Sequence, residues 1–317
     1  MREFELIRRI AAFNDRLPRS VTLPPGDDMA AIALSEGAEI LVAADSAIEG
    51  RHAPFGCDPY LLGRKAVLRN LSDVAAMGSA QPLATLACAI FPHGIDENRA
   101  WRLFEGLRET AEQWGAPLIG GDTSSYHARC GASPIVASVM ILARSGGASR
   151  RIASRADARL GDGVFVTGSI GGSWDPATGL GRHLDFTPRL DAAHAISSLL
   201  GERLGAMIDV SDGLGRDLGH IASASRVAIA VDLALVPVTR GVAPRAAIGQ
   251  GEDYELAFTA RGAVPDEVAG VPITRIGTVV AGAPSVTVHD GHDAFEAMEL
   301  GFEHDGGRCG SGGGVTT

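Results

Sequence analysis

The residues of this chain best suited to chemistry are aspartates that recur in short, mostly apolar frames. The frames are Gly26-Asp27-Asp28, Ala44-Asp45, Asn70-Leu71-Ser72-Asp73, Gly120-Gly121-Asp122-Thr123 and Ile208-Asp209-Val210-Ser211-Asp212-Gly213. A carboxylate at the edge of an apolar segment is costly unless a partner compensates its charge, and these frames contain almost no arginine. Oxygen ligands without His or Cys favour Mg²⁺, which commonly also binds substrate phosphates. The pattern therefore predicts an enzyme that depends on Mg²⁺ and on a nucleotide.

Asp73 gives the strongest single indication. Residues 58–77 predict a helix with Asp58 as its N-cap and Gly78 as its stop. Asp73 lies on an otherwise small and apolar stretch of this helix, which favours a functional role. The structural alternative is an ion pair with Arg69, four residues earlier.

The other early frames each have a structural alternative. Gly26-Asp27-Asp28 also suits a turn. Asp45 ends the expected strand 39–44, and the carboxyl end of a strand is a common place for a site, although the residue could simply end the strand. The glycines of Gly120-Gly121 allow close approach of backbone to a ligand, or form a Gly-Gly turn.

The later frames also have both a functional and a structural interpretation. Asp209, Ser211 and Asp212 place two carboxylates and a hydroxyl within four residues, more than one helix cap needs, although Asp212 could cap a helix over 213–224. The acidic segment Gly251-Glu252-Asp253-Tyr254-Glu255 is either part of a site or a solvated loop.

Several familiar site types are missing from the sequence. No GxxxxGK motif is present, Lys65 is the only lysine, and no GxSxG or convincing GxGxxG occurs. Phosphate binding is therefore expected to work through Mg²⁺ rather than through a lysine-containing loop.

Composition narrows the function further. The net charge of −10 argues against a general nucleic-acid surface, but an acidic site can bind an anion through metal ions. Cys57, Cys88, Cys130 and Cys309 lack the spacing of a zinc site or disulfide framework, so a cytoplasmic protein is expected. Neither a signal peptide nor a membrane-spanning run of about 18 apolar residues is expected.

The order of elements predicts an α/β (α+β) protein of two domains. The N-terminal domain, 1–148, is expected to form a mixed sheet, and the C-terminal α/β domain occupies 149–305, with a Gly-rich tail, 306–317, predicted to be disordered. Helices are expected at 3–13, 58–77, 96–114, 189–200 and 213–224. Strands are expected at 29–34, 39–44, 83–91, 117–119, 134–143, 164–167, 206–210, 227–232, 254–259, 273–280 and 284–288, with the domain connection at 144–161.

Taken in order, the frames resemble the thiamine-monophosphate kinase family, which belongs to the superfamily of the aminoimidazole ribonucleotide and selenophosphate synthetases. The resemblance covers nearly the whole chain. Further matching segments are Glu3-Phe4-Glu5-Leu6-Ile7, Glu49-Gly50-Arg51-His52, Gly161-Asp162, Val166-Thr167-Gly168 and Gly301-Phe302-Glu303-His304. Each motif alone is weak, but the ordered set is specific.

The resemblance implies ATP-dependent phosphorylation of thiamine monophosphate to thiamine diphosphate, in a homodimer whose N-terminal sheets pair. It implies metal ligands at Asp28, Asp45, Asp73, Asp122, Asp209 and Asp212. It implies nucleotide contacts from Gly121, Asp122, Arg155 and Ser211. It implies substrate contacts from His52, Glu252 and Phe302, with Phe302 offering an aromatic face to a thiamine ring.

Two departures from the family pattern bear on activity. Ala43 and Ala44 stand where the family usually has hydroxyl residues, and the stretch Ser145 to Ser154 is longer than usual, which affects the placement of Arg155. An enzyme of the same superfamily with another acceptor, or a non-catalytic nucleotide-binding homologue, remains an alternative. The selenophosphate branch is disfavoured because no N-terminal Cys lies near a Lys and a Gly.

Overall fold

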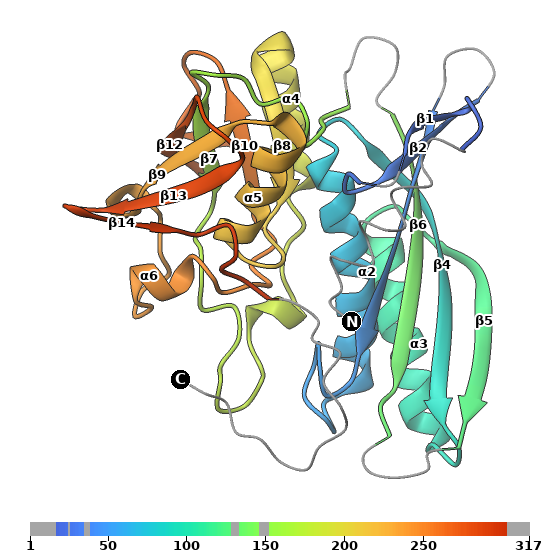
Figure 1. The fold of residues 1–317 in the computed structure, drawn as a ribbon. Coiled ribbons are helices and arrows are strands. Elements are labelled where there is room, and N and C mark those ends of the chain that lie inside the picture. The colour runs from blue at the N-terminus through green and yellow to red at the C-terminus, as the bar shows by residue number, and fades with distance from the viewer. Residues whose placement is uncertain (1–16, 25, 35–38, 128–132, 146–151, 303–317) are drawn as a thin grey trace.

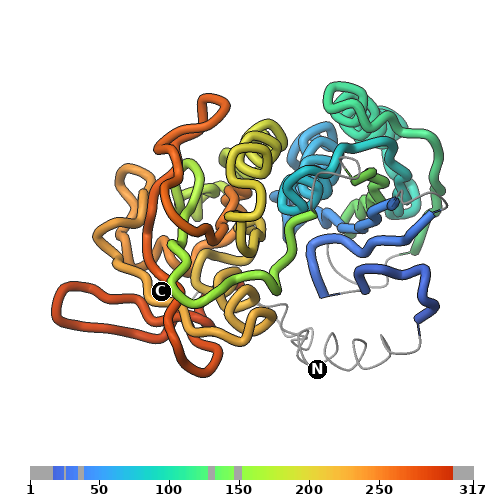
Figure 2. The backbone as a smooth tube through the Cα atoms, turned by 90° about the horizontal axis from the view of Figure 1, so that it is seen from above, coloured from blue at the N-terminus to red at the C-terminus, as the bar shows by residue number. Residues whose placement is uncertain are grey.

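The computed structural model describes residues 17–24, 26–34, 39–127, 133–145 and 152–302. The expected helix 3–13 and the expected tail 306–317 lie outside these residues. The described chain forms two α/β halves that lie side by side (Figure 1, Figure 2). No helix among the described residues is long and apolar enough to cross a membrane. The expected fold class, a mixed α/β protein with two sheets, is confirmed.

The N-terminal half contains a six-stranded sheet with the order β1-β2-β3-β6-β4-β5, in which only β4 and β5 are parallel neighbours. Its strands are β1 (Val21–Leu23), β2 (Ala30–Ala33), β3 (Glu39–Ile48), β4 (Gln81–Pro92), β5 (Leu118–Tyr126) and β6 (Val136–Arg144).

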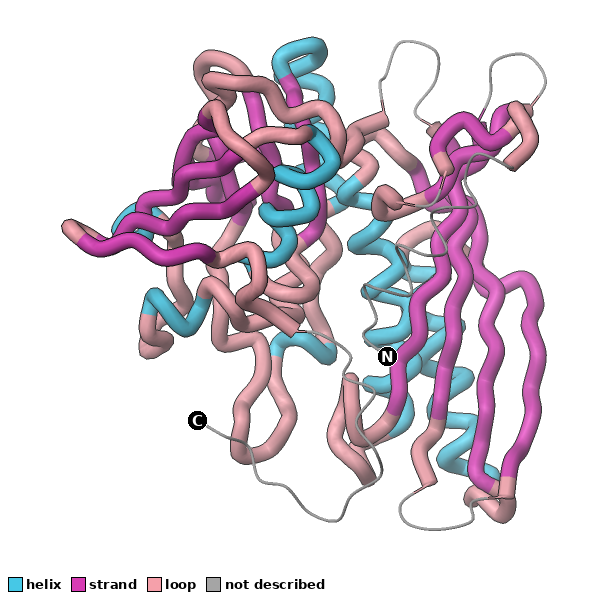
Figure 3. The backbone as a smooth tube through the Cα atoms, in the orientation of Figure 1, coloured by secondary structure: helices cyan, strands magenta, loops and turns pink. Residues whose placement is uncertain are grey.

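Helices α2 (Pro59–Ala76) and α3 (Glu97–Gln113) cover one face of this sheet (Figure 3). Helix α2 begins at its expected N-cap, because the Asp58 carboxylate accepts the Tyr60 N–H. Asp96, expected as the first residue of its helix, is instead the N-cap of α3, because its carboxylate accepts the Asn98 N–H. The two helices approach closely at Gly106, where a Cβ atom would lie 2.1 Å from a backbone oxygen of α2. This close contact fixes α2 against the sheet.

The other face of the six-stranded sheet has no described element packed on it. Side chains alternate along the strands, so that Val139 and Ile141 of β6 are buried against the helices while Met140 between them is exposed. Ile32 of β2 and Ile90 of β4 are exposed on the same face as Met140. We call this surface the open face.

The C-terminal half is built on a second mixed sheet with the order β14-β13-β9-β12-β7-β10-β8, and β11 pairs with β12. Its strands are β7 (Gly163–Thr167), β8 (Leu204–Asp209), β9 (Ala228–Asp232), β10 (Leu256–Ala260), β11 (Glu267–Val268), β12 (Val271–Val280), β13 (Ser285–Asp290) and β14 (Asp293–Glu296). The helices are α4 (Leu190–Leu200), α5 (Leu214–Ser225) and α6 (Pro244–Ala247), with 3₁₀ turns at Arg182–Leu184, Gly201–Arg203 and Leu233–Leu235.

The two halves meet along α2, which contacts α4 and β8 as well as its own sheet. The helix is therefore buried on both sides, and most of its side chains are inaccessible. Any polar side chain of α2 that faces the second half lies in the seam between the two sheets.

Two expectations about strands were wrong. Asp45 does not end its strand, because β3 continues to Ile48 in register with β6. Gly120-Gly121-Asp122-Thr123 is not a turn after a short strand, because it lies inside β5 and pairs in parallel with β4. Gly121 is needed there because a Cβ atom would lie 1.8 Å from the Ala87 oxygen of β4. The short strands β1, β11 and β14 were not expected at all.

Candidate active site

Three aspartates from distant parts of the sequence meet in the seam between the halves. Asp28 lies just before β2, Asp73 lies near the end of α2, and Asp209 is the last residue of β8. One carboxylate oxygen from each lies within 4.8 Å of the others. We call these three residues the central cluster. Sequence reasoning placed all three among the metal ligands.

Asp45 lies beside the central cluster with a guanidinium as its partner. Arg69 Nε lies 3.1 Å from Asp45 Oδ2, and Arg69 Nη1 donates a hydrogen bond to the Ser46 oxygen at 2.6 Å. The expected alternative for Asp73, an ion pair with Arg69 on the same helix, is therefore not formed. Within the described residues, no hydrogen bond or ion pair reaches the Asp73 carboxylate.

Arg155 also turns toward the carboxylates. Its Nη2 donates to Asp28 Oδ1 at 2.7 Å and its Nε to Asp28 Oδ2 at 3.2 Å, while its backbone N–H donates to Asp27. Asp28 and Asp45 therefore have arginine partners, although their own frames contain no arginine. Arg155, expected to contact the nucleotide, lies at the edge of the same site.

Two guanidiniums do not balance this much negative charge. Burial, followed by repulsion from neighbouring aspartates, raises the pKa of Asp73 well above its ordinary value of 3.8. Burial also raises the pKa of Asp209, with repulsion from Asp28 next, against the hydrogen bond from Ser72 Oγ at 2.7 Å. Carboxylate oxygens crowded together with excess charge suit a hard divalent cation. Asp28, Asp73 and Asp209 therefore fit Mg²⁺.

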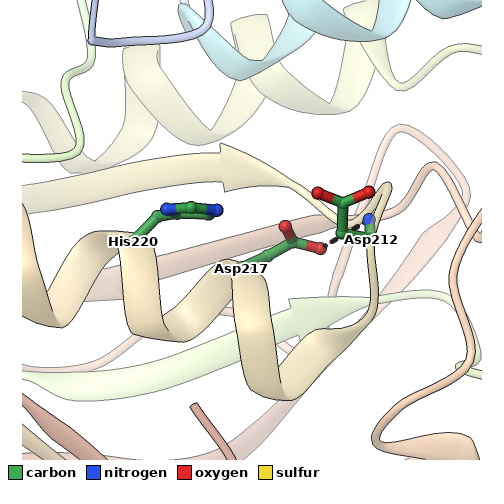
Figure 4. A group of neighbouring side chains, drawn as sticks. All are labelled: Asp212, Asp217 and His220. Carbon is green, nitrogen blue, oxygen red and sulfur yellow. Dashed lines mark hydrogen bonds between the residues drawn. The ribbon is translucent and has the colours of Figure 1, made fainter. Parts of the chain in front are cut away.

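Asp212 belongs to a second group further along the chain. It lies near Asp217 and His220 of α5, and the ligand atoms of these three residues also lie within 4.8 Å of one another (Figure 4). The structural alternative was that Asp212 caps the helix, but the N-cap of α5 is Gly213. Asp217 Oδ2 instead accepts the backbone N–H groups of Ser211, Asp212 and Gly213 at 3.0–3.2 Å. This carboxylate fixes the loop that carries Ser211 and Asp212.

The segment 252–255 packs against that same loop. Glu252 N donates to the Ser211 oxygen and Tyr254 N to the Val210 oxygen. The solvated-loop alternative was wrong, because Asp253 is buried against Arg182, and Glu255 makes two hydrogen bonds to Arg189. These ion pairs hold the segment in place.

Glu252 has a left-handed backbone, with φ of 64°. Such a conformation costs about 1–3 kcal/mol for a residue other than glycine and is concentrated at functional sites. It directs the carboxylate toward Lys65 of α2, whose Nζ lies 2.6 Å from Glu252 Oε1, and toward His183. Burial alone would raise the pKa of Glu252, but the contacts with His183 and Lys65 outweigh it and lower the pKa to about 2.

His52 and Phe302, the other two expected substrate residues, come from opposite ends of the chain. His52 is buried, its Nδ1 accepts the Ile48 N–H, and its backbone oxygen accepts a hydrogen bond from Lys65 at 2.6 Å. Phe302 is 44% exposed, its N–H is bound by the Asp212 oxygen, and the Arg51 guanidinium carbon lies 4.7 Å from its ring centre. Such exposure does not suit a residue that covers a core edge.

Gly121 and Asp122 lie away from this site. Asp122 of β5 pairs with Cys88 of β4, which pairs with Ser138 of β6, which in turn pairs with Ser46 of β3. Paired residues lie on the same face of a sheet, so the side chain of Asp122 lies on the open face. Asp45 faces the helices instead. Three strand spacings, about 14 Å, separate β3 from β5. A single chain therefore does not bring Asp122 to the central cluster.

Sequence reasoning missed three residues of the site. Lys65 lies on the same mostly apolar helix as Asp73, but from the sequence it was used only to exclude a lysine-containing phosphate loop. His183 and Asp217 carried no distinct signal, because their partners lie far along the chain or on a loop whose shape the sequence does not reveal.

We predict that Mg²⁺ stabilises this protein more as the pH rises from about 6 to about 8. Carboxyl groups with raised pKa values bind more protons in the folded state than in the unfolded state, so the stability of the cation-free protein falls as these protons are lost. Bound Mg²⁺ would offset the repulsion between the ionised carboxylates. The melting temperature should be measured with and without Mg²⁺ at both pH values, at matched ionic strength.

The control for this prediction is a pair of variants. Asp73→Asn should reduce the Mg²⁺-dependent increase, whereas Asp191→Asn, at an exposed position on α4, should leave it unchanged. An increase of the same size at both pH values would contradict a cation bound by these aspartates.

The chain is similar to several known proteins. Residues 26–144 match the family described as AIR synthase related protein, N-terminal domain. The thiamine-monophosphate kinase of Haemophilus influenzae is 30% identical over 339 aligned residues, which cover 96% of this chain and 98% of the relative.

Solved structures give the same result. The thiamine-monophosphate kinase of Stenotrophomonas maltophilia K279a is 31% identical, with a TM-score of 0.68 over 90% of this chain and 96% of that chain. The structure of AaThiL complexed with AMPPCP and TMP is 26% identical, with a TM-score of 0.74 over 93% of this chain and 96% of that chain. This chain belongs to the thiamine-monophosphate kinase family.

Proposed function

We propose that this protein transfers the γ-phosphoryl group of ATP to the phosphate of thiamine monophosphate, in the presence of Mg²⁺, and so forms thiamine diphosphate. The central cluster carries the proposal, because buried carboxylates with excess charge adjoin the expected acceptor residues. The family relatives and the AaThiL complex with AMPPCP and TMP support the choice of both substrates.

The chemistry requires little acid–base catalysis. An oxygen of the substrate phosphate attacks the γ-phosphorus in line, the new P–O bond forms as the bond to the ADP oxygen breaks, and ADP leaves. The attacking oxygen is already ionised at neutral pH, so no strong general base is needed. The main barrier is repulsion between two anions, and bound Mg²⁺ neutralises their charge and aligns them.

The side chains of this chain divide the remaining work. Asp28, Asp73 and Asp209 would hold Mg²⁺, with Asp45 beside this cluster and Asp212 in the second group with Asp217 and His220. Ser211 and Arg155 would contact the nucleotide. His52, Glu252 and Phe302 would contact the thiamine phosphate. Glu252 and Phe302 donate backbone hydrogen bonds to the oxygens of Ser211 and Asp212, which supports an acceptor site next to the nucleotide.

We further propose a homodimer assembled through the N-terminal domain, residues 1–148, with residues 149–305 forming the second domain. Apolar side chains on the open face support an interface there. Edge strand β5 is exposed along most of its length, which also favours a partner. In such a dimer, Gly121 and Asp122 of one copy would complete the nucleotide site of the other.

The dimer predicts a solution mass of two chains, independent of dilution through the micromolar range, measured by light scattering. Met140→Glu places a charge at the centre of the open face and should shift the protein to the monomer mass. Arg108→Glu, an exposed change on α3, is the matched control. A monomer mass for the unaltered protein would contradict the proposal.

The proposed function is tested by ATP turnover. The protein should release ADP only when thiamine monophosphate and Mg²⁺ are both present, with loss of activity after dialysis against EDTA. Turnover with another phosphorylated acceptor alone would indicate a different enzyme of the superfamily, and no turnover with any acceptor would indicate a non-catalytic homologue.

Asp73→Asn should lower kcat by at least about a hundredfold while leaving the fold intact, because it removes a charge on which cation binding depends. Asp191→Asn should retain normal turnover. Near-normal activity of Asp73→Asn at saturating Mg²⁺ would exclude a metal-binding role for Asp73.

Phe302→Ala should raise the KM for thiamine monophosphate and leave the KM for ATP unchanged. Stacking of an aromatic side chain on a ring contributes about 0.5–1.5 kcal/mol beyond its buried area, which corresponds to about a 2- to 12-fold change. Because the ring is half-exposed, little thermal stability should be lost. A lower melting temperature with unchanged KM values would instead assign Phe302 to packing.

A further inference from the structure

Lys65, the only lysine of the chain, is buried in the seam between the halves. Its side chain is completely inaccessible, and its Nζ lies 2.6 Å from the His52 oxygen, from His183 Nδ1 and from Glu252 Oε1. The three contacts match the three N–H bonds of an ammonium. Burying this charge is costly unless such partners are present.

The imidazole of His183 contacts both charged groups. Its Nδ1 lies 2.6 Å from Lys65 Nζ and 3.0 Å from Glu252 Oε2, and its Nε2 lies 3.0 Å from the Gly179 oxygen. Glu252 is 26% exposed, so its carboxylate is accessible to a ligand.

The three partners of Lys65 belong to both halves of the molecule. His52 follows β3 of the N-terminal half, whereas His183 and Glu252 lie in loops of the C-terminal half. Glu252 also has a strained left-handed backbone, so the direction of its carboxylate depends on the contacts that hold it. One buried ammonium therefore joins two expected substrate residues across the seam.

We infer that Lys65 is a positioning residue for the acceptor: its ammonium fixes the Glu252 carboxylate and the His52 backbone in the geometry that binds thiamine monophosphate. This inference rests on the proposed function. Lys65 makes no described contact with the central cluster, so its effect falls on the acceptor rather than on ATP. Burial lowers the pKa of Lys65 to about 8 despite the opposing charge of Glu252, so the ammonium form still predominates at neutral pH.

Arg64 offers a matched control on the same helix. Its Nε lies 2.6 Å from Asp185 Oδ1 of the C-terminal half, so it also joins the two halves through an ion pair. Asp185 is 62% exposed, and Arg64 has no described contact with an expected substrate residue. Removing Arg64 therefore removes a link across the seam without altering the acceptor residues.

The test compares Lys65→Met with Arg64→Met in steady-state kinetics. Lys65→Met keeps the length and packing of the side chain, and it should raise the KM for thiamine monophosphate by at least about tenfold while the KM for ATP stays within about twofold. Arg64→Met should leave both KM values unchanged. Equal increases in both KM values, or no increase for thiamine monophosphate, would overturn the inference.

A double-variant cycle separates positioning from general stability. If Lys65 acts through Glu252, then Lys65→Met combined with Glu252→Gln should raise the KM for thiamine monophosphate no further than Glu252→Gln does alone. Independent effects that multiply would contradict a role through Glu252. If Lys65→Met does not fold, Lys65→Arg is the second variant, and it should fold and recover part of the acceptor binding. If Lys65→Arg has normal KM values for both substrates, then only the positive charge is required and not its position. That result would overturn the inference.

A measurement without catalysis distinguishes this inference from the proposed function. Labelling with [ζ-¹⁵N]lysine gives one side-chain signal, because Lys65 is the only lysine. Adding thiamine monophosphate should shift this signal, whereas adding a non-hydrolysable ATP analogue alone should not. A shift without turnover would refute the kinase activity and retain the acceptor site, and turnover without a shift would refute the role of Lys65.

Discussion

Repulsion among buried carboxylates is the physical constraint on which this structure depends. Asp28, Asp73 and Asp209 come together from three elements and two halves of the chain, and the fold supplies only part of the positive charge that would balance them. Folding must bring these groups together before a cation can bind them. The stability of the apolar sheets and helices therefore supports a local arrangement that is unfavourable by itself, which is typical of functional sites.

Helix α2 is the element that makes this arrangement possible. Lys65, Arg69, Ser72 and Asp73 follow one another at the spacing i, i+4, i+7 and i+8, so they form one polar stripe on an otherwise buried helix. Lys65 and Ser72 contact Glu252 and Asp209 of the second half, whereas Arg69 contacts Asp45 of the first. One end of the stripe contacts the expected acceptor residues, and the other end contributes to the expected Mg²⁺ site. The sites proposed for the two substrates thus lie along a single helix.

The sequence was sufficient for the fold class and the main helices, because each depends on local signals, whereas the set of metal-binding aspartates was expected from the family resemblance. Asp58 and Asp96 are strong N-caps, and a lone carboxylate such as Asp73 is conspicuous on an apolar helix. The sequence was insufficient to predict features that depend on pairing between distant strands. Gly121 appears to suit a ligand loop until its parallel pairing with β4 shows that the neighbouring strand requires a glycine.

Side-chain partners were still harder to predict, because they are chosen by the fold. Arg69 of α2 pairs with Asp45 of β3 rather than with Asp73 on its own helix, and Asp217 holds the loop that carries Asp212. Lys65 illustrates the same limit, because its three acceptors lie at sequence separations of 13 to 187 residues.

The central claim is that the aspartates of the seam bind divalent cations between two phosphate substrates. The most direct measurement is a crystal structure with Mn²⁺ and a non-hydrolysable ATP analogue, in which the anomalous signal locates the metal. The account predicts a peak within about 2.0–2.3 Å of carboxylate oxygens of Asp73 and Asp209. An occupied nucleotide site whose metal peaks all lie away from these two aspartates would contradict it.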